Sequence, residues 1–202
     1  MKRAVLIAIV LVFSYQTIYA SGLVEYRDLL IGITVEQTKL DIQQLLEDEG
    51  VILPEDSIDP VSRRYQYGQF GYRHEAFTVF WSVWGSYGEV TTKNENTNFT
   101  FENKSYELDN IRTTYKKLGA TIGFVMFGLT TEYGLTEYEV KVKNADKSLF
   151  SNVQPSWTAG AYLSSWADYY RSMVVLLEVK RELLNPYDAG SIIAAARLNI
   201  LF

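Results

Sequence analysis

The sequence predicts an all-β protein: a closed, antiparallel up-and-down barrel of about eight strands, with ten strands as the alternative. Three observations carry this prediction. Short segments alternate between apolar and polar residues, which is typical of strands. Aromatic residues make up 14% of the 202-residue chain, and tyrosine alone occurs 15 times. Finally, long and short connections alternate between the segments, as they do in barrels with short turns at one end and longer loops at the other.

The first 20 residues are typical of a secretory signal peptide, which leaves 21–202 for the barrel. Lys2 and Arg3 precede an unbroken apolar run at 4–13. This run is too short to span a bilayer as a helix, but it has the length of a signal-peptide core. Cleavage after residue 20, 21 or 22 fits the pattern. The alternative is an N-terminal anchor or a buried first helix.

Composition excludes several classes of function. The chain has no cysteine, so disulfides, thiolate metal sites and lipid attachment through a cysteine are excluded. Its net charge of −5 argues against nucleic acid as a partner, because phosphate binding needs a basic face. No motif for a cofactor or metal occurs, and none is expected to bind.

Eight segments are predicted as strands from their alternation and from the turn-forming residues between them. The segment near 106–128 is long for one strand, which keeps ten strands open as an alternative. Short turns are expected at 73–75, 129–132 and 168–169, and long loops at 45–60, 92–105, 144–155 and 183–190. The strands are expected within 29–44, 61–72, 76–91, 106–128, 133–143, 156–167, 170–182 and 191–202.

Alternation separates two faces but does not say which one points inward. In the fifth strand, Tyr138 and Val140 oppose Glu137 and Glu139. A soluble barrel also alternates, with its apolar face inside and its polar face in water. Position along the chain has to decide between a membrane barrel and a soluble ligand-binding one.

The last strand carries the membrane interpretation. The given sequence ends in a phenylalanine, with apolar residues at every second position before it. In this respect it resembles the OmpA/OmpX-like small outer-membrane β-barrel proteins of Gram-negative bacteria, whose terminal strand is read by the barrel-assembly machinery. This resemblance implies a transmembrane barrel in the bacterial outer membrane. The residues that match the assembly signal are Ala194, Ala196, Leu198, Ile200 and Phe202.

Tyrosine and tryptophan favour the two interfaces of a membrane, because their rings are apolar and their polar ends are wet. Several of them lie near the ends of predicted strands. Ordinary strand packing is the competing explanation for each of them. The candidates for such an aromatic girdle are Tyr65, Tyr67, Trp81, Tyr87, Trp157, Tyr169 and Tyr170.

If the apolar faces contact lipid, the charged faces fill the interior, which in an eight-stranded barrel is just wide enough for side chains. Buried charges must then pair, since unpaired ones are costly. We therefore predict a lumen charge network that plugs the barrel. Its predicted members are Arg64, Glu137, Glu139, Lys141, Glu178, Lys180 and Arg197, with Glu36 as a further candidate.

The predicted function is a non-enzymatic, monomeric outer-membrane barrel with a structural or surface-interaction role. Its partners would be outer-membrane lipid, lipopolysaccharide, the assembly machinery and an extracellular partner at the loops. One alternative is a narrow channel for small solutes or hydrophobic compounds; another is a soluble periplasmic ligand-binding barrel. A lipid-modifying enzyme comes last, because the single histidine, His74, is expected at a solvated turn.

Overall fold

The structure, a computed structural model, describes residues 25–53, 60–76, 79–93, 97–124, 126–143, 145, 147–167, 171–188 and 192–202. The predicted signal peptide, residues 1–20 with cleavage up to residue 22, lies outside these ranges. Among the described residues, no helix is long and apolar enough to cross a membrane.

Nine antiparallel strands and one short helix make up the described part of the chain. Strands that are neighbours in sequence pair with one another, except β3 and β4, and β1 also pairs with β9. The elements are β1 (Glu25–Leu40), α2 (Ile42–Asp48), β2 (Val61–Ala76), β3 (Val79–Lys93), β4 (Asn98–Phe101), β5 (Lys104–Phe124), β6 (Phe127–Val142), β7 (Phe150–Trp166), β8 (Met173–Glu182) and β9 (Ile192–Leu201).

Pairing between β3 and β5 closes the sheet into a ring. The remaining strand, β4, pairs only with the start of β5 and stands outside this ring, so eight of the nine described strands form the barrel. The prediction of a closed, up-and-down barrel of eight strands is therefore confirmed. The long fourth segment does not contain two barrel strands; it is the single 21-residue strand β5, which projects beyond the ring.

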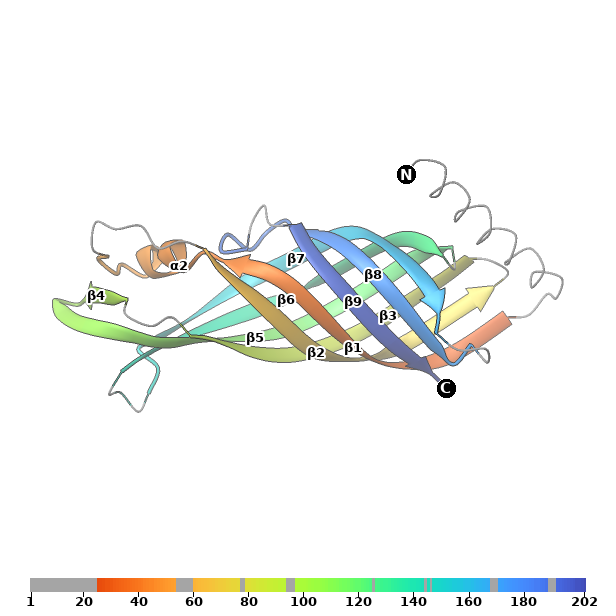
Figure 1. Ribbon diagram of the computed structural model, residues 1–202, viewed down its shortest axis with the longest axis horizontal. Coiled ribbons are helices and arrows are strands. Elements are labelled where there is room, and N and C mark those ends of the chain that lie inside the picture. The colour runs from red at the N-terminus through yellow and green to blue at the C-terminus, as the bar shows by residue number, and fades with distance from the viewer. Residues whose placement is uncertain are drawn as a thin grey trace.

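The two ends of the barrel differ (Figure 1). Short connections at 77–78, 125–126 and 167–172 join strands at one end, which also holds the C-terminus and is called the turn end below. The opposite end carries α2, β4 and the projecting part of β5, and is called the cap end. The tight turn expected at 129–132 was misplaced: β6 already begins at Phe127.

Helix α2 was missed by the sequence analysis, which expected a polar loop at 45–60. Asp41 begins the helix, since its carboxylate accepts a hydrogen bond from the backbone N–H of Gln44 at 3.0 Å. Ile42, Leu45 and Leu46 are buried, which is the i, i+3, i+4 spacing of an amphipathic helix. The helix has only seven residues, so this signal was lost among the acidic residues that follow it.

The outer surface of the barrel is apolar in the part nearer the turn end. Most side chains that face outward there are apolar, and many that face inward are polar or charged. Ile200 and Ile122 face outward, whereas Arg197 and Glu178 are buried inside. This is the reverse of a soluble barrel. Outward-facing residues that are more than half exposed include Ile33, Phe70, Leu118, Leu129, Leu163 and Leu177; we call this surface the apolar band.

Candidate functional site

The barrel interior holds a cluster of six charged side chains, which we call the central charge cluster. They lie at inward-facing positions of β1, β5, β6, β8 and β9, and each is almost completely buried. Three are acidic and three are basic, so the cluster is neutral when all six are ionised. Its members are Glu36, Lys117, Glu132, Glu178, Lys180 and Arg197.

Glu132 of β6 is the hub of the cluster. Its carboxylate lies 3.0 Å from Lys180 Nζ, 3.2 Å from Arg197 Nη2 and 4.0 Å from Lys117 Nζ. The hydroxyl oxygen of Tyr67 lies 3.2 Å from the same carboxylate. One carboxylate therefore ties together four strands of the ring, β2, β5, β8 and β9.

The other two carboxylates complete the pairing. Glu178 lies 2.8 Å from Arg197 and 3.5 Å from Lys180, while Glu36 is ion-paired with Lys180. Tyr67 donates a hydrogen bond to Glu36 at 2.7 Å. Buried ions are costly unless they are paired, and this cluster balances three acids against three bases.

An aromatic ring packs over the cluster. The guanidinium of Arg197 lies 3.9 Å from the ring centroid of Trp84, a cation–π contact in a desolvated setting. Gly119 allows the indole to lie flat against β5, because a Cβ at this position would come within 2.3 Å of the Trp84 ring. Trp84 and the central charge cluster thus lie together in the barrel interior.

A second charged layer closes the turn end. Arg73 Nη2 lies 2.8 Å from Glu75 Oε2, and both side chains are buried. The Arg73 guanidinium also lies 4.2 Å from the ring centroid of Phe80 and 4.8 Å from that of Trp166. Arg171 approaches Glu75 at 3.8 Å from the connection between β7 and β8.

At the cap end, the connection after β8 folds back into the barrel mouth. Glu182 Oε1 accepts backbone hydrogen bonds from Leu183, Leu184 and Asn185 and so fixes the start of this connection. Asn185 then donates to the hydroxyl of Tyr138 at 2.7 Å.

Asp188, in the same connection, is 2.6 Å from the buried Arg63 of β2. Burial raises the pKa of the Asp188 carboxyl above its ordinary value, and the Arg63 guanidinium opposes that rise. Burial also raises the pKa of Tyr187 to about 12, so this phenol stays protonated at neutral pH. The connection between β8 and β9 is therefore anchored to β2 through Asp188 and to β6 through Asn185.

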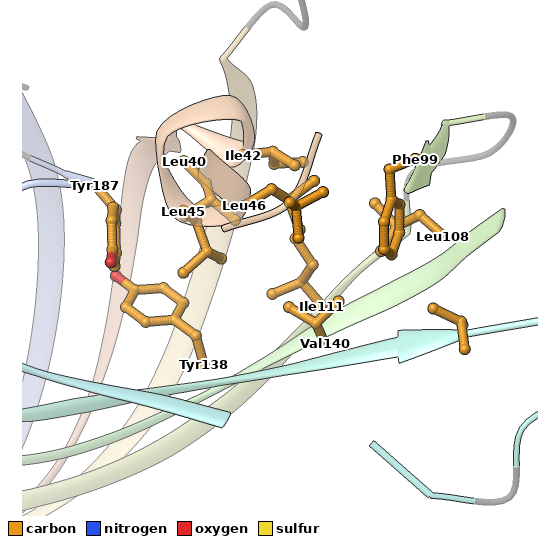
Figure 2. Close-up of a cluster of buried hydrophobic side chains, with 12 residues drawn as sticks. Leu40, Ile42, Leu45, Leu46, Phe99, Leu108, Ile111, Tyr138, Val140 and Tyr187 are labelled. Atoms are coloured by element: carbon orange, nitrogen blue, oxygen red, sulfur yellow. The ribbon is translucent and has the colours of Figure 1, made fainter. Parts of the chain in front are cut away.

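Above the mouth, an apolar core covers the cap end (Figure 2). Leu45 and Leu46 point from α2 toward Ile111 of β5 and Val140 of β6. Phe99 of β4 joins this core from the side, and Ile52 forms an antiparallel bridge with Thr100. The cap is thus a small folded unit on extended strands, with its own hydrophobic core.

Three of the seven predicted lumen residues, Glu178, Lys180 and Arg197, lie in the central charge cluster. Glu36 lies there as well. The other four predictions were wrong, because the structure places these side chains on the outer surface of the barrel. They are Arg64, Glu137, Glu139 and Lys141.

The error in β6 has a physical cause. In the half of β6 nearer the turn end, the outward-facing residues include Leu129, Tyr133 and Leu135. Toward the cap end, the outward-facing positions become charged. The inward positions there, Tyr138 and Val140, are apolar because they pack under the cap. Where a strand extends beyond the apolar band, its outward-facing residues become polar and its inward-facing residues become apolar. The alternation of inward and outward positions itself continues unchanged.

Arg64 was predicted in place of its neighbour. In β2 the inward phase is Arg63, Tyr65 and Tyr67, all buried, so Arg64 faces outward. Two adjacent arginines give no alternation signal, and the apolar character of tyrosine suggested the opposite face. Lys117 and Glu132 were not among the predicted lumen residues. Glu132 was expected in the tight turn at 129–132, whereas β6 already begins at Phe127.

The candidates for the aromatic girdle differ in the direction of their side chains. Trp81, Tyr87 and Trp157 face outward and are each about half exposed. Tyr65 and Tyr67 point into the interior, where Tyr67 contacts the central charge cluster, so they are not girdle residues. Two further candidates, Tyr169 and Tyr170, lie outside the described residues.

The predicted assembly-signal residues share the outward face of β9. Ala194, Ala196, Leu198 and Ile200 alternate there with the buried Ala195, Arg197 and Asn199. Phe202 follows the strand and is exposed, and its backbone pairs with Leu29 of β1.

His74 was expected at a solvated turn, but it lies within β2. Its ring centroid is 5.5 Å from that of Trp81 on the next strand. Across the described ranges, no group of three or more His, Cys, Asp or Glu side chains is arranged to hold a metal ion.

No protein-family model and no curated protein matches the chain. Similar solved structures include Ail, the attachment invasion locus protein of Yersinia pestis, at 15% identity and a TM-score of 0.45, over 88% of this chain and 98% of Ail. A second Ail structure, in complex with the heparin analogue sucrose octasulfate, has the same identity and TM-score.

The N-terminal β-barrel domain of Pseudomonas aeruginosa OprF is also similar, at 11% identity and a TM-score of 0.38, over 86% of this chain and 97% of that domain. These proteins are small outer-membrane β-barrels, the class that the sequence resembles. The architecture described above rests on the strand pairing and burial of the chain itself.

Proposed function

We propose that the protein is a monomeric, non-enzymatic β-barrel of the bacterial outer membrane with a closed lumen and a structural or surface-interaction role. One observation carries this proposal. The barrel presents a hydrophobic outer surface around an interior that holds buried ion pairs. Only a lipid environment makes that arrangement stable, because the closed ring leaves no unpaired strand edge and the apolar side chains need a non-aqueous solvent.

The orientation follows from the two ends. Short turns lie on the periplasmic side of outer-membrane barrels and longer connections lie outside. The turn end therefore faces the periplasm and the cap end faces the exterior. In this orientation the signal peptide exports the chain, and the outward face of β9, ending at Phe202, serves as the signal for the assembly machinery.

The lumen is closed at three levels: the Arg73–Glu75 pair, the central charge cluster, and the Arg63–Asp188 pair with its plugging connection. An eight-stranded barrel has little more interior volume than its side chains occupy. This argues against the channel alternative. It also disfavours a soluble ligand-binding barrel, which would need an apolar cavity inside.

The cap is the feature that supports a surface role. Strands β5 and β6 continue past the apolar band and build a hydrophobic core with α2 and β4. The cap is not needed to close the lumen, because the charged layers between the cap and the turn end already close it. A rigid scaffold that presents loops is a common arrangement for recognition, and an extracellular partner would meet the cap first.

Conductance in planar lipid bilayers tests the closed lumen. We expect the refolded protein to show no steady conductance above the lipid leak at neutral pH. A Leu45→Asp variant breaks the core of the cap, yet it should stay closed, because the charged layers lie below α2. Insertion is verified by heat-modifiable migration on gels.

Stable unitary conductance of the inserted wild type would contradict the closed lumen and favour the channel. Conductance in Leu45→Asp alone would instead assign the closure to the cap. Recovery of the protein with the soluble periplasmic fraction would overturn the membrane assignment.

A further inference from the structure

The outer surface of the barrel carries a groove of about 810 Å³ that crosses β2, β3, β5 and β6. This volume lies within the range of about 300–1,000 Å³ that is typical of ligand clefts. The groove lies where the apolar band ends toward the cap: beyond Tyr87 on β3 comes Glu89, and beyond Leu135 on β6 comes Glu137. Its outward-facing walls are Phe70, Tyr87, Leu118, Tyr133 and Leu135.

Two glycines make the hollow. Gly68 of β2 and Gly85 of β3 lie on adjacent strands, and both line the groove. A Cβ at Gly68 would meet no atom within 4 Å, and one at Gly85 would touch only the tip of Leu118, at 3.9 Å. Other glycines of the barrel, such as Gly119, are enclosed by neighbouring atoms. The space above Gly68 and Gly85 is therefore open to the surroundings of the barrel.

One charged side chain stands at the cap-side end of this groove. Lys116 of β5 faces outward between Tyr87 and Leu135, its partners in register on β3 and β6. The adjacent Lys117 points inward to Glu132, so its charge is already matched. No acidic residue lines the groove, and among the described residues none forms an ion pair with Lys116. The groove is thus apolar with a single unmatched positive charge at its outer end.

We propose that the groove binds lipid A, with an acyl chain lying over Gly68 and Gly85 and a phosphate contacting the Lys116 ammonium. This inference rests on the proposed function, because it needs the cap end to face the outer leaflet. Lysine extends its charged end to the interface while its stem covers apolar surface, which places the ammonium at phosphate depth. Tyr87 and Tyr133 provide amphipathic walls at the same interface.

A second outer groove offers an internal comparison. It has a volume of about 630 Å³ and crosses β5, β6, β7 and β8 toward the turn end, with Ala161 on its floor. Its outward-facing side chains are all apolar, because Glu178, which also borders it, is directed into the lumen. It lacks a counterpart of Lys116, so it has no means of selecting a phosphorylated lipid.

Native mass spectrometry of the refolded full chain tests the proposal, with hexa-acylated lipid A, its dephosphorylated form and phosphatidylglycerol as probes. We expect a one-to-one adduct with lipid A. Lys116→Met should weaken it about tenfold, as expected for losing a hydrogen bond between charged groups, and should remove the preference for the phosphorylated form. The double variant Gly68→Leu/Gly85→Leu fills the open space and should abolish the adduct. Ala161→Leu, in the second groove, should leave it unchanged.

Equal adducts in the wild type, Lys116→Met and the double variant would overturn the proposal, as would the absence of any adduct with the wild type. Phosphatidylglycerol that displaces lipid A at equal concentration would also overturn it, because the site would then accept any anionic lipid. Heat-modifiable migration shows that each variant is folded. Failure of the proposed function is a separate result, since it appears as loss of the wild type from the outer-membrane fraction.

Discussion

Replacing Lys180 by methionine should lower the free energy of unfolding by about 3–5 kcal/mol, the cost of leaving buried charges without their partner. Lys180 is fully buried and contacts all three carboxylates of the central charge cluster. Without it, three acids face only Lys117 and Arg197. Methionine has a similar shape, so the loss comes from charge and not from a cavity. Urea unfolding in lipid vesicles measures the change.

Two variants make this experiment specific. Lys141→Met removes an outward-facing lysine of β6, and we expect a change within about 0.5 kcal/mol, as for most surface substitutions. The double variant Lys180→Met/Glu36→Gln restores the balance of charge and should lose less than Lys180→Met alone. Equal losses for Lys180→Met and Lys141→Met would contradict the assignment of the interior, and a double variant no better than the single one would show that charge balance is not what stabilises it.

An arginine in the apolar band should be almost as costly. Leu177 lies at the middle of the outward face of β8, between Val175 and Val179, and is more than half exposed. At the bilayer midplane of a barrel, arginine costs about 2–4 kcal/mol, because its charge must leave water or deform the membrane. We therefore expect Leu177→Arg to reduce the free energy of unfolding in vesicles by this amount.

The matched control is Thr91→Arg, which also faces outward but lies on β3 beyond the apolar band. We expect its effect to stay within about 0.5 kcal/mol, since the side chain remains in water. In a soluble barrel both positions would be solvated and both substitutions tolerated. Equal tolerance of Leu177→Arg and Thr91→Arg would therefore contradict the membrane environment of the band.

The strands that lie wholly within the band could be predicted well from sequence. In β8 as far as Val179, and in β9, the outer positions are apolar and several of the inner ones are charged or amide, so Lys180 and Arg197 were assigned to the correct side. Their environment is constant along their length. Alternation then carries the same meaning from one end of the strand to the other.

Strands that extend beyond the band could not be interpreted in this way. The half of β6 nearer the cap end has water outside it instead of lipid, and the apolar core of the cap inside it instead of the charged lumen. Glu137 and Glu139 therefore face outward, opposite to the prediction. Likewise, β7 begins at Phe150, inside the loop that was expected at 144–155. Asn152 and Pro155 resemble turn residues, although both lie within the strand. The position of the membrane boundary along each strand is a tertiary property that no local pattern contains.

The most direct test of the account is which side of each strand meets lipid. The chain has no cysteine, so a single cysteine can carry one spin label at any chosen position. In vesicles, labels at Leu177 and Leu198 should collide with oxygen dissolved in the lipid. Labels at Leu176 and Ala195, which face inward from the same two strands, should be shielded from it. Oxygen access at Leu176 and Ala195, with Leu177 and Leu198 shielded or in contact with water, would contradict the account.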